Sequence, residues 1–162
     1  MESTSRRHVM LKLIPDDDPR LHAKAEMFNP RKWDELDTTI AAMFEVMKEH
    51  DGIGLAAPQV GIMKRLFIMH VGFSKYVCIN PKITRYGKET RLQDEGCLSY
   101  PEQKFMVKRS LEIRVSYQDA KGNNVAKKYS GLLARCFQHE LDHLNGIVMS
   151  DVGTPMDMGT PM

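Results

Sequence analysis

The strongest helical pattern in the chain lies between residues 29 and 50, where apolar positions recur at three- and four-residue spacing. They are Trp33, Leu36, Ile40, Met43, Phe44 and Met47. This spacing places the side chains on one face of an α-helix, and Pro30 suits the first turn of such a helix. Asp51-Gly52 supplies a typical stop. We therefore predict a long N-terminal helix over residues 30–50.

A second helical pattern follows Ser130 and ends at Asn145-Gly146. Ser130 is a favourable N-cap residue, and Asn-Gly is typical of a helix end in the left-handed conformation. One face of this helix carries Leu132, Cys136, His139, Glu140 and His143. Because a stripe at this spacing usually faces the core, we expect these side chains to point into the protein.

Several short segments alternate between apolar and polar positions, or are apolar runs bounded by turn residues. They are residues 9–14, 66–71, 75–79, 83–92 (on either side of a turn at Tyr86-Gly87), 111–118 and 124–129. Such segments predict β-strands, with hairpin turns at residues 72–74 and 119–122 and a strand end at Asn80-Pro81. The predicted fold is α+β: antiparallel β-sheets surround the central helix that follows Ser130, and the long N-terminal helix of residues 30–50 packs outside. We assign residues 1–149 to one domain, with frayed residues 1–7, and residues 150–162 to a short loose tail.

Composition and charge narrow the choice of partners. The 162 residues carry a net charge of +2, with both signs interspersed, which gives no reason to expect direct nucleic-acid recognition or an anionic membrane. No apolar run reaches the ~18 residues of a membrane span, and no hydrophobic segment of signal length follows Arg6-Arg7. Three widely spaced cysteines argue against a disulfide framework. A reducing cytoplasm is the expected compartment.

The second predicted helix carries the motif His139-Glu140-Leu141-Asp142-His143. Residues four apart lie on nearly the same helical face, so His139 and His143 can direct two imidazoles at one point with Glu140 beside it. Two neutral imidazoles and a carboxylate suit a metal-activated water. The alternative is a buried cluster without metal, which is costly unless its polar groups are paired.

Two further segments are built from small residues and carry candidate chemistry. In Glu95-Gly96-Cys97-Leu98-Ser99, Cys97 becomes a third ligand if it points at the helix; otherwise it is an inert buried cysteine. A Cys-His-His set with an open fourth position is typical of catalytic sites. In the segment from Gly52 to Gln59 the small residues allow close backbone approach, and Gln59 offers an uncharged donor. A tight packing loop with an exposed Gln59 is the alternative there.

Taken together and in this order, these three segments closely resemble the signature motifs of peptide deformylase, across residues 9–149. The resemblance implies that Cys97, His139 and His143 bind one divalent metal ion. Fe²⁺ is expected, and Zn²⁺, Ni²⁺ or Co²⁺ can substitute. It further implies that Glu140 acts as general base and acid, and that Gln59 and the backbone N–H of Leu98 stabilise the developing oxyanion. The implied reaction removes the N-formyl group from N-formylmethionine of nascent peptides and releases formate.

The same resemblance implies how substrate and partners are recognised. Ile53, Gly54, Leu132 and Cys136 are expected to bind the methionine side chain, with Arg135 at the rim of the pocket. The expected partners are an N-formylmethionyl peptide and, transiently, the ribosome, and we expect a monomer. The printed sequence stops soon after the second helix. In this it resembles short deformylases of some phages that lack a C-terminal helix, for which the compartment is the host cytoplasm.

Two other functions compete with this one. A zinc endopeptidase resembling thermolysin takes a third ligand Glu from well downstream of its His-Glu-x-x-His, but neither Glu nor His follows His143. A non-catalytic, metal-stabilised binding module would coordinate the ion fully with protein ligands and would have no need of Glu140.

Overall fold

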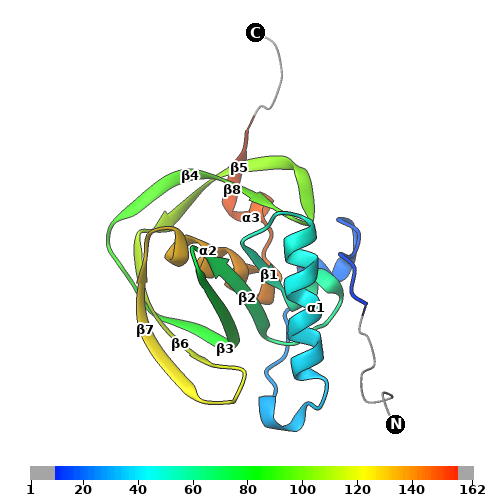
Figure 1. The fold of residues 1–162 in the computed structure, drawn as a ribbon. Helices are drawn as coiled ribbons and strands as arrows, with labels where there is room; N and C mark the ends of the chain where they lie inside the picture. Colours follow the sequence, from blue (N-terminus) through cyan, green and yellow to red (C-terminus); the bar gives the residue numbers. More distant parts are fainter. Residues whose placement is uncertain (1–9, 157–162) are drawn as a thin grey trace.

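The computed structural model describes residues 10–156 and shows an α+β fold, as the sequence predicts (Figure 1). A five-stranded sheet has the order β1-β2-β3-β6-β7, and a three-stranded sheet has the order β4-β5-β8. Neighbouring strands in both sheets are antiparallel. The strands are β1 (Gly54–Ala56), β2 (Leu66–Val71), β3 (Ser74–Tyr86), β4 (Thr90–Cys97), β5 (Tyr100–Ser110), β6 (Glu112–Gln118), β7 (Asn124–Ser130) and β8 (Gly153–Pro155).

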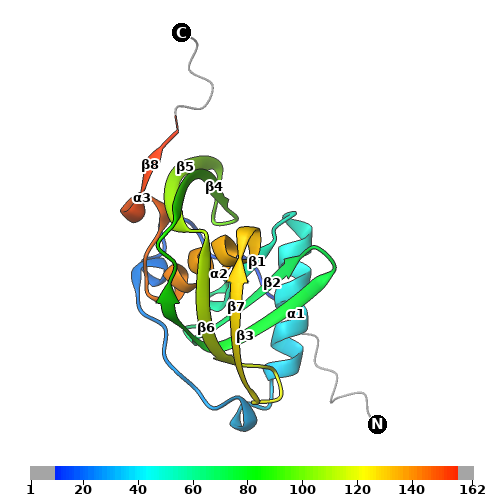
Figure 2. The ribbon, with the colours of Figure 1, turned by 90° about the vertical axis from the view of Figure 1, so that its left-hand side faces the viewer.

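Helix α2 (Gly131–Leu144) lies between the two sheets (Figure 2). The motif residues His139, Glu140 and His143 are buried. Phe137 and Leu144 are fully buried and pack with residues of the five-stranded sheet such as Phe67 and Ile113. Gly131 adopts a φ of 63°, which favours glycine at the turn into the helix. Ser130 occupies the N-cap as predicted, but its side chain makes no capping hydrogen bond.

Helix α1 (Leu36–Glu49) packs on the outside of the five-stranded sheet and is shorter than predicted. Residues 30–35 are not part of it. Pro30 instead begins the 3-10 helix η3 (Pro30–Lys32), whose N-cap Asn29 accepts a hydrogen bond from the N–H of Arg31. Trp33, which directly follows η3, still packs against the apolar cluster that contains the buried residues of α1, and its ring lies edge-on to Phe28. The helical spacing of Trp33 therefore reflected a shared core and not a continuous helix.

Two predictions about strands are wrong: one predicted strand does not form, and another continues beyond its predicted end. Residues 10–14 form no strand: Leu11 and Leu13 pack on the α1 core, but Ile14 alone donates a backbone hydrogen bond, to Gln59 O. Residues 1–7 and Val9 lie outside the described part of the chain. Asn80-Pro81 does not end its strand, because β3 continues to Tyr86 through an irregular pairing. Asn80 takes a φ of 50° there, and its side-chain amide donates to Phe28 O and Gln118 Oε1.

The end of the described chain is more ordered than the predicted loose tail. Helix α3 (Met149–Val152) leads into β8, which pairs with Phe105, Met106 and Val107 of β5. Residues 157–162 lie outside the described part. Strand β5, which the sequence pattern did not reveal, pairs along its length with β4 and so carries the chain past the metal-motif helix.

Two further 3-10 helices, η2 (Pro19–His22) and η4 (Ala57–Val60), complete the fold. Asp18 caps η2: its side chain accepts a hydrogen bond from the N–H of Arg20 and pairs with the Arg20 guanidinium. Within residues 10–156, no helix combines the length and the apolar character needed to cross a membrane.

Candidate metal and catalytic site

The structure brings the three predicted ligands together. One ligand atom each from Cys97, His139 and His143 lies within 4.8 Å of the other two. Cys97 Sγ and His143 Nε2 are 3.2 Å apart, and the two imidazole rings have centroids 5.1 Å apart. Cys97 ends β4, where the pairing with β5 is irregular between Gly96 and Cys97, and that irregularity turns the thiol towards α2.

A buried ion-pair network holds the first histidine in place. Glu95 Oε1 accepts a hydrogen bond from His139 Nδ1 at 2.9 Å, which leaves Nε2 of that ring free to bind an ion. Arg109 donates to both oxygens of Glu95 at 3.0 Å, and to Asp142 as well. Burial alone would raise the pKa of Glu95, but the hydrogen bonds from His139 and Arg109 outweigh it and lower that pKa to about 2. Glu95 is therefore a charged acceptor at neutral pH.

Sequence reasoning missed the roles of Glu95, Arg109 and Gln138. Glu95 stood inside a motif, but nothing in the sequence spacing connects it with Arg109. Gln138 ties α2 to the end of β5 by both halves of its amide. Its Nε2 donates to Ser110 O at 2.8 Å, and its Oε1 accepts from Ser110 N at 3.1 Å. Arg109 and the histidines are thus fixed relative to each other through adjacent residues of β5 and α2.

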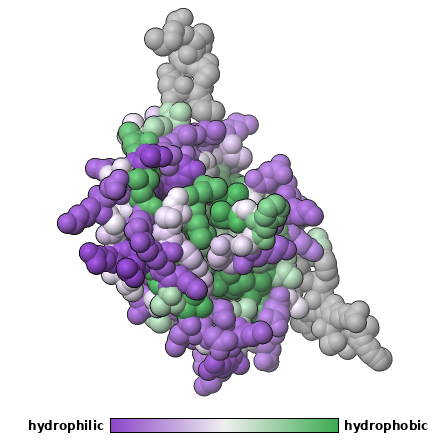
Figure 3. Space-filling view, turned by 60° about the vertical axis from the view of Figure 1, so that its left-hand side comes forward, coloured by the Kyte–Doolittle hydropathy of each residue, from purple (hydrophilic) through white to green (hydrophobic). Residues whose placement is uncertain are grey.

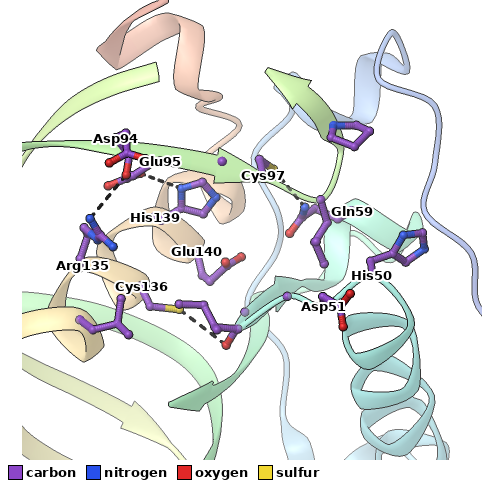
Figure 4. A pocket seen from close by; sticks show the side chains of 17 residues that line it. His50, Asp51, Gln59, Asp94, Glu95, Cys97, Arg135, Cys136, His139 and Glu140 are labelled. Carbon is purple, nitrogen blue, oxygen red and sulfur yellow. Dashed lines mark hydrogen bonds and ion pairs between the residues drawn. The ribbon is translucent and has the colours of Figure 1, made fainter. Parts of the chain in front are cut away.

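Gln59 is buried, and its amide orientation is determined by its partners. The N–H of Ala56 donates to Gln59 Oε1 at 2.9 Å, so the Nε2 end must point the other way. Nε2 donates to Ser99 Oγ at 3.0 Å and approaches Cys97 Sγ at 3.4 Å. The exposed-glutamine alternative is therefore wrong: Gln59 presents donor hydrogens at the edge of the ligand cluster (Figure 4).

Glu140 lies one step along α2 from His139 and points into the same cavity (Figure 4). Its Oε1 and the Nδ1 of His143 are buried without a hydrogen-bond partner among the described residues. Burial raises the pKa of Glu140 to about 7 and lowers that of His143 well below its usual range. A buried neutral imidazole and a carboxyl that titrates near neutral pH are suited to ligation and to proton transfer, respectively.

Small residues make room for this carboxylate. A Cβ added to Gly54 would lie 2.6 Å from Glu140 Oε2 and 2.8 Å from Cys136 Sγ. A Cβ added to Gly52 would lie 2.7 Å from a methyl group of Leu98. The glycines at these two positions therefore allow the backbone to lie close to the side chains of Glu140, Cys136 and Leu98, as the small residues of this segment predict.

The cavity has a volume of about 380 Å³, and every residue that the sequence assigned to substrate binding lines it. These are Ile53, Gly54, Leu132 and Cys136, and Leu98 and Arg135 join them. Ile53 is 42 % exposed and Leu132 is 45 % exposed, so they form the rim and not the inward face predicted for Leu132. Figure 3 shows a face of the molecule on which apolar residues gather near the middle, surrounded by hydrophilic ones.

The donor set fits a single divalent ion. One thiol sulfur and two imidazoles converge, the second histidine is favoured in its neutral form, and unpartnered Glu140 Oε1 faces the same space. Three protein ligands leave a fourth tetrahedral position for water or substrate, which is the catalytic pattern. A peptidase site with a downstream Glu ligand does not form here, because the third donor in the cluster is Cys97.

Comparison with known proteins shows the family of this chain. The family model for polypeptide deformylase matches residues 10–157. A peptide deformylase of Thermotoga maritima is 46 % identical over 139 residues, covering 85 % of this chain and 84 % of the relative.

Solved structures show the same fold. The crystal structure of peptide deformylase from Thermotoga maritima superposes with a TM-score of 0.86 at 44 % identity, covering 91 % of this chain and all of that one. A peptide deformylase from Synechococcus elongatus in complex with actinonin gives a TM-score of 0.84 at 43 % identity, covering 88 % of this chain and 78 % of that one. A probable peptide deformylase from Synechococcus phage S-SSM7 gives 0.81 at 41 % identity, covering 88 % and 99 %. This chain belongs to the polypeptide deformylase family, the hydrolases that remove N-formyl groups from nascent peptides.

Proposed function

We propose that this deformylase acts through one divalent metal ion held by Cys97, His139 and His143, with Glu140 as the group that moves the proton. The observation that carries the proposal is that the three donor atoms lie within 4.8 Å of one another, beside a cavity that Cys97, His139 and Glu140 line. We expect Fe²⁺ as the native ion, with Zn²⁺, Ni²⁺ or Co²⁺ able to replace it. When bound, the ion supplies Lewis acidity and lowers the pKa of a water ligand towards 7.

Glu140 is proposed as general base and then general acid. Hydrolysis forms a bond from the water oxygen to the formyl carbon and breaks the bond from that carbon to nitrogen. Glu140 accepts the proton that the water loses and returns it to the leaving nitrogen, so that formate and a free amine result. In the metal-free protein burial raises the pKa of this carboxyl to about 7, and a raised pKa makes the carboxylate a stronger proton acceptor.

Gln59 and the backbone N–H of Leu98 are proposed to stabilise the negative charge on the formyl oxygen. The contact with Ala56 N directs the Gln59 amide N–H groups towards Cys97 and Ser99 before any substrate arrives. Leu98 lies in the turn between β4 and β5, directly after Cys97, and lines the cavity. Donors fixed in this way need little reorganisation as charge develops, which is what makes them effective.

The methionine side chain is proposed to bind against Ile53, Gly54, Leu132 and Cys136. Ile53 and Leu132 offer an apolar rim, and Gly54 lets the backbone lie close to Glu140 and Cys136. Cys136 offers a thiol whose pKa burial raises well above its usual range. The thiol of Cys136 is thus uncharged at neutral pH and compatible with an apolar ligand. Arg135, held by Gln93 Oε1, places a positive charge at the edge of this subsite.

We further propose that the enzyme acts as a monomer in the cytoplasm, or in that of a host if the source is viral, with transient ribosome contact. The support for the ribosome contact is the family's substrate, because formylated peptides arise at the ribosome.

The experiment that tests the proposal is substitution Glu140→Gln, which keeps the size of the side chain but cannot accept the proton. We expect turnover of a formyl-Met peptide, measured as formate release, to fall by at least ~100-fold, with metal content and fold unchanged. Undiminished turnover in a metal-loaded, folded variant would contradict the assigned role of Glu140.

A further inference from the structure

The outer surface of the five-stranded sheet carries a row of positive charges that the active site does not use. Arg114 of β6 is paired directly with Arg85 of β3 on one side and with Lys128 of β7 on the other. All three side chains are exposed. We call these three residues the basic row. It lies on the face turned away from α2, because the alternating residues Ile113, Val115 and Tyr129 pack with α2 in the core.

Little negative charge compensates the basic row. Within residues 10–156, Glu112 forms an ion pair with Lys128 at 3.1 Å, while Arg85 and Arg114 have no ion-pair partner. Lys82 adds a fourth exposed cation on the same face, paired in register with Ser116 one step along the strands. The surface therefore concentrates positive charge in a chain whose net charge is only +2.

This arrangement works against the stability of the sheet. Like charges directly opposite each other on neighbouring strands are destabilising, whereas opposite charges there are favourable. Arg114 meets this disadvantage on both sides. Apart from the ion pair of Lys128 with Glu112, no ion pair among residues 10–156 offsets this repulsion. An external anion that bridges neighbouring strands would relieve the repulsion.

We propose that the basic row is a docking surface for the phosphate backbone of RNA, a partner that the net charge of the chain alone gave no reason to expect. Adjacent strands are about 4.8 Å apart, so the row spans roughly 10 Å and can meet several phosphates of a duplex. The outward-facing neighbours Thr84, Ser116 and Ala126 are small or polar, so the face offers neither aromatic rings for base stacking nor bulky apolar groups for a lipid surface. The contact would read charge and shape, not sequence. This docking surface does not depend on the proposed catalytic roles.

The test compares two double charge reversals that change the net charge equally. Arg85→Glu/Arg114→Glu reverses two of the three charges of the basic row. Lys24→Glu/Lys32→Glu reverses the charge of two exposed lysines elsewhere on the surface. Binding of a fluorescent 20-base-pair RNA duplex is measured by anisotropy at several salt concentrations. We expect the unaltered enzyme to bind with a log–log salt slope of about −3, since each neutralised phosphate contributes about −0.9. The row variant should lose at least about tenfold in affinity and about two units of slope, and the control variant should lose less than threefold.

Two further readouts distinguish the basic row from the active site and from a general effect of charge. Formate release from a formyl-Met peptide should be unchanged in both double variants, so a failure of the catalytic proposal would leave this inference intact. The single substitution Arg114→Glu should raise the melting temperature by about 1–3 °C, because it replaces repulsion by attraction. Equal losses of RNA affinity in the two double variants, no RNA binding by the unaltered enzyme, or tighter binding to phosphatidylserine vesicles than to RNA would each overturn the proposal.

Discussion

The missing side chain of Gly54 and the carboxylate of Glu140 occupy adjoining space: a Cβ on Gly54 would lie 2.6 Å from Glu140 Oε2. Gly54 begins β1, whose pairing with β2 fixes its backbone, and Glu140 is held on the buried face of α2. Neither backbone can withdraw easily, so the position of the carboxylate depends on glycine at residue 54.

Gly54→Ala should therefore displace Glu140 and lower kcat/KM for a formyl-Met peptide by at least ~10-fold, an amount that corresponds to about 1.4 kcal/mol. Metal content should stay at the level of the unaltered enzyme, since the three ligands are not touched by the new methyl group. Gly96→Ala is the control, because a Cβ there meets nothing within 4 Å. Equal activity of the two variants would show that the close approach at Gly54 is unimportant.

Gln59→Leu should lower kcat by about 100-fold, the usual effect of losing one oxyanion donor. The substitution removes the donor hydrogens but leaves the metal ligands in place, so bound metal should not change. Ser99→Ala is a matched control: it removes only the partner of Gln59 Nε2, and kcat should fall by less than ~10-fold. Steady-state kinetics with metal-loaded protein measure kcat for both variants. A larger loss of kcat in Ser99→Ala than in Gln59→Leu would contradict the role of Gln59 as an oxyanion donor.

Glu95→Gln should weaken metal binding by about 10- to 100-fold, as is usual when the carboxylate partner of a ligating histidine is lost. The charge of Glu95 orients His139 and compensates buried Arg109, so the variant should also unfold at lower denaturant concentration. Competition with a chelator measures the affinity. Asp94→Asn, which removes an exposed pairing with Lys104, is the control and should bind metal normally. A normal affinity in the Glu95 variant would remove its orienting role.

The metal-free protein should show a pH dependence that comes from Glu140. Burial raises the pKa of this carboxyl from 4.5 to about 7, so between these values the folded state keeps a proton that the unfolded state has released. The stability contributed by protonated Glu140 is thus present below about pH 4.5 and is lost as the pH rises to about 7, by about 3 kcal/mol. Urea unfolding at pH 4.5 and 7.5 should show Glu140→Gln gaining that amount relative to the unaltered protein. A constant difference between the two proteins would contradict the raised pKa.

Local patterns predicted some of the elements that position the site. The repeat of apolar and motif residues identified α2, and turn residues located the β6–β7 hairpin. The same reasoning overextended α1 by including Trp33, because a residue can join a helix's core from a neighbouring turn. Residues 10–14 were predicted as a strand because they are mostly apolar. A strand also needs a neighbouring strand to pair with, and this segment makes only the backbone hydrogen bond from Ile14 to Gln59.

Long-range pairings were beyond the reach of sequence periodicity. The contact of Arg109 with Glu95 joins β5 to β4, and its contact with Asp142 joins β5 to α2. No local spacing connects these residues, so their role in orienting His139 emerged only with the fold. The basic row is a similar case: Arg85, Arg114 and Lys128 are far apart in the chain and become neighbours through strand register. Cys97 was assigned as a ligand from its motif, and its distance to the histidines required the β4–β5 turn.

The central claim is that one sulfur and two imidazole nitrogens hold a single ion, and metal analysis with X-ray absorption tests it most directly. Protein purified without oxygen should contain one iron per chain, with one sulfur at about 2.3 Å and two nitrogen neighbours at about 2.1 Å, by analogy with zinc sites. Cys97→Ala should lose the sulfur signal and most of the metal. One ion per chain in that variant, with an unchanged absorption spectrum, would contradict the claim.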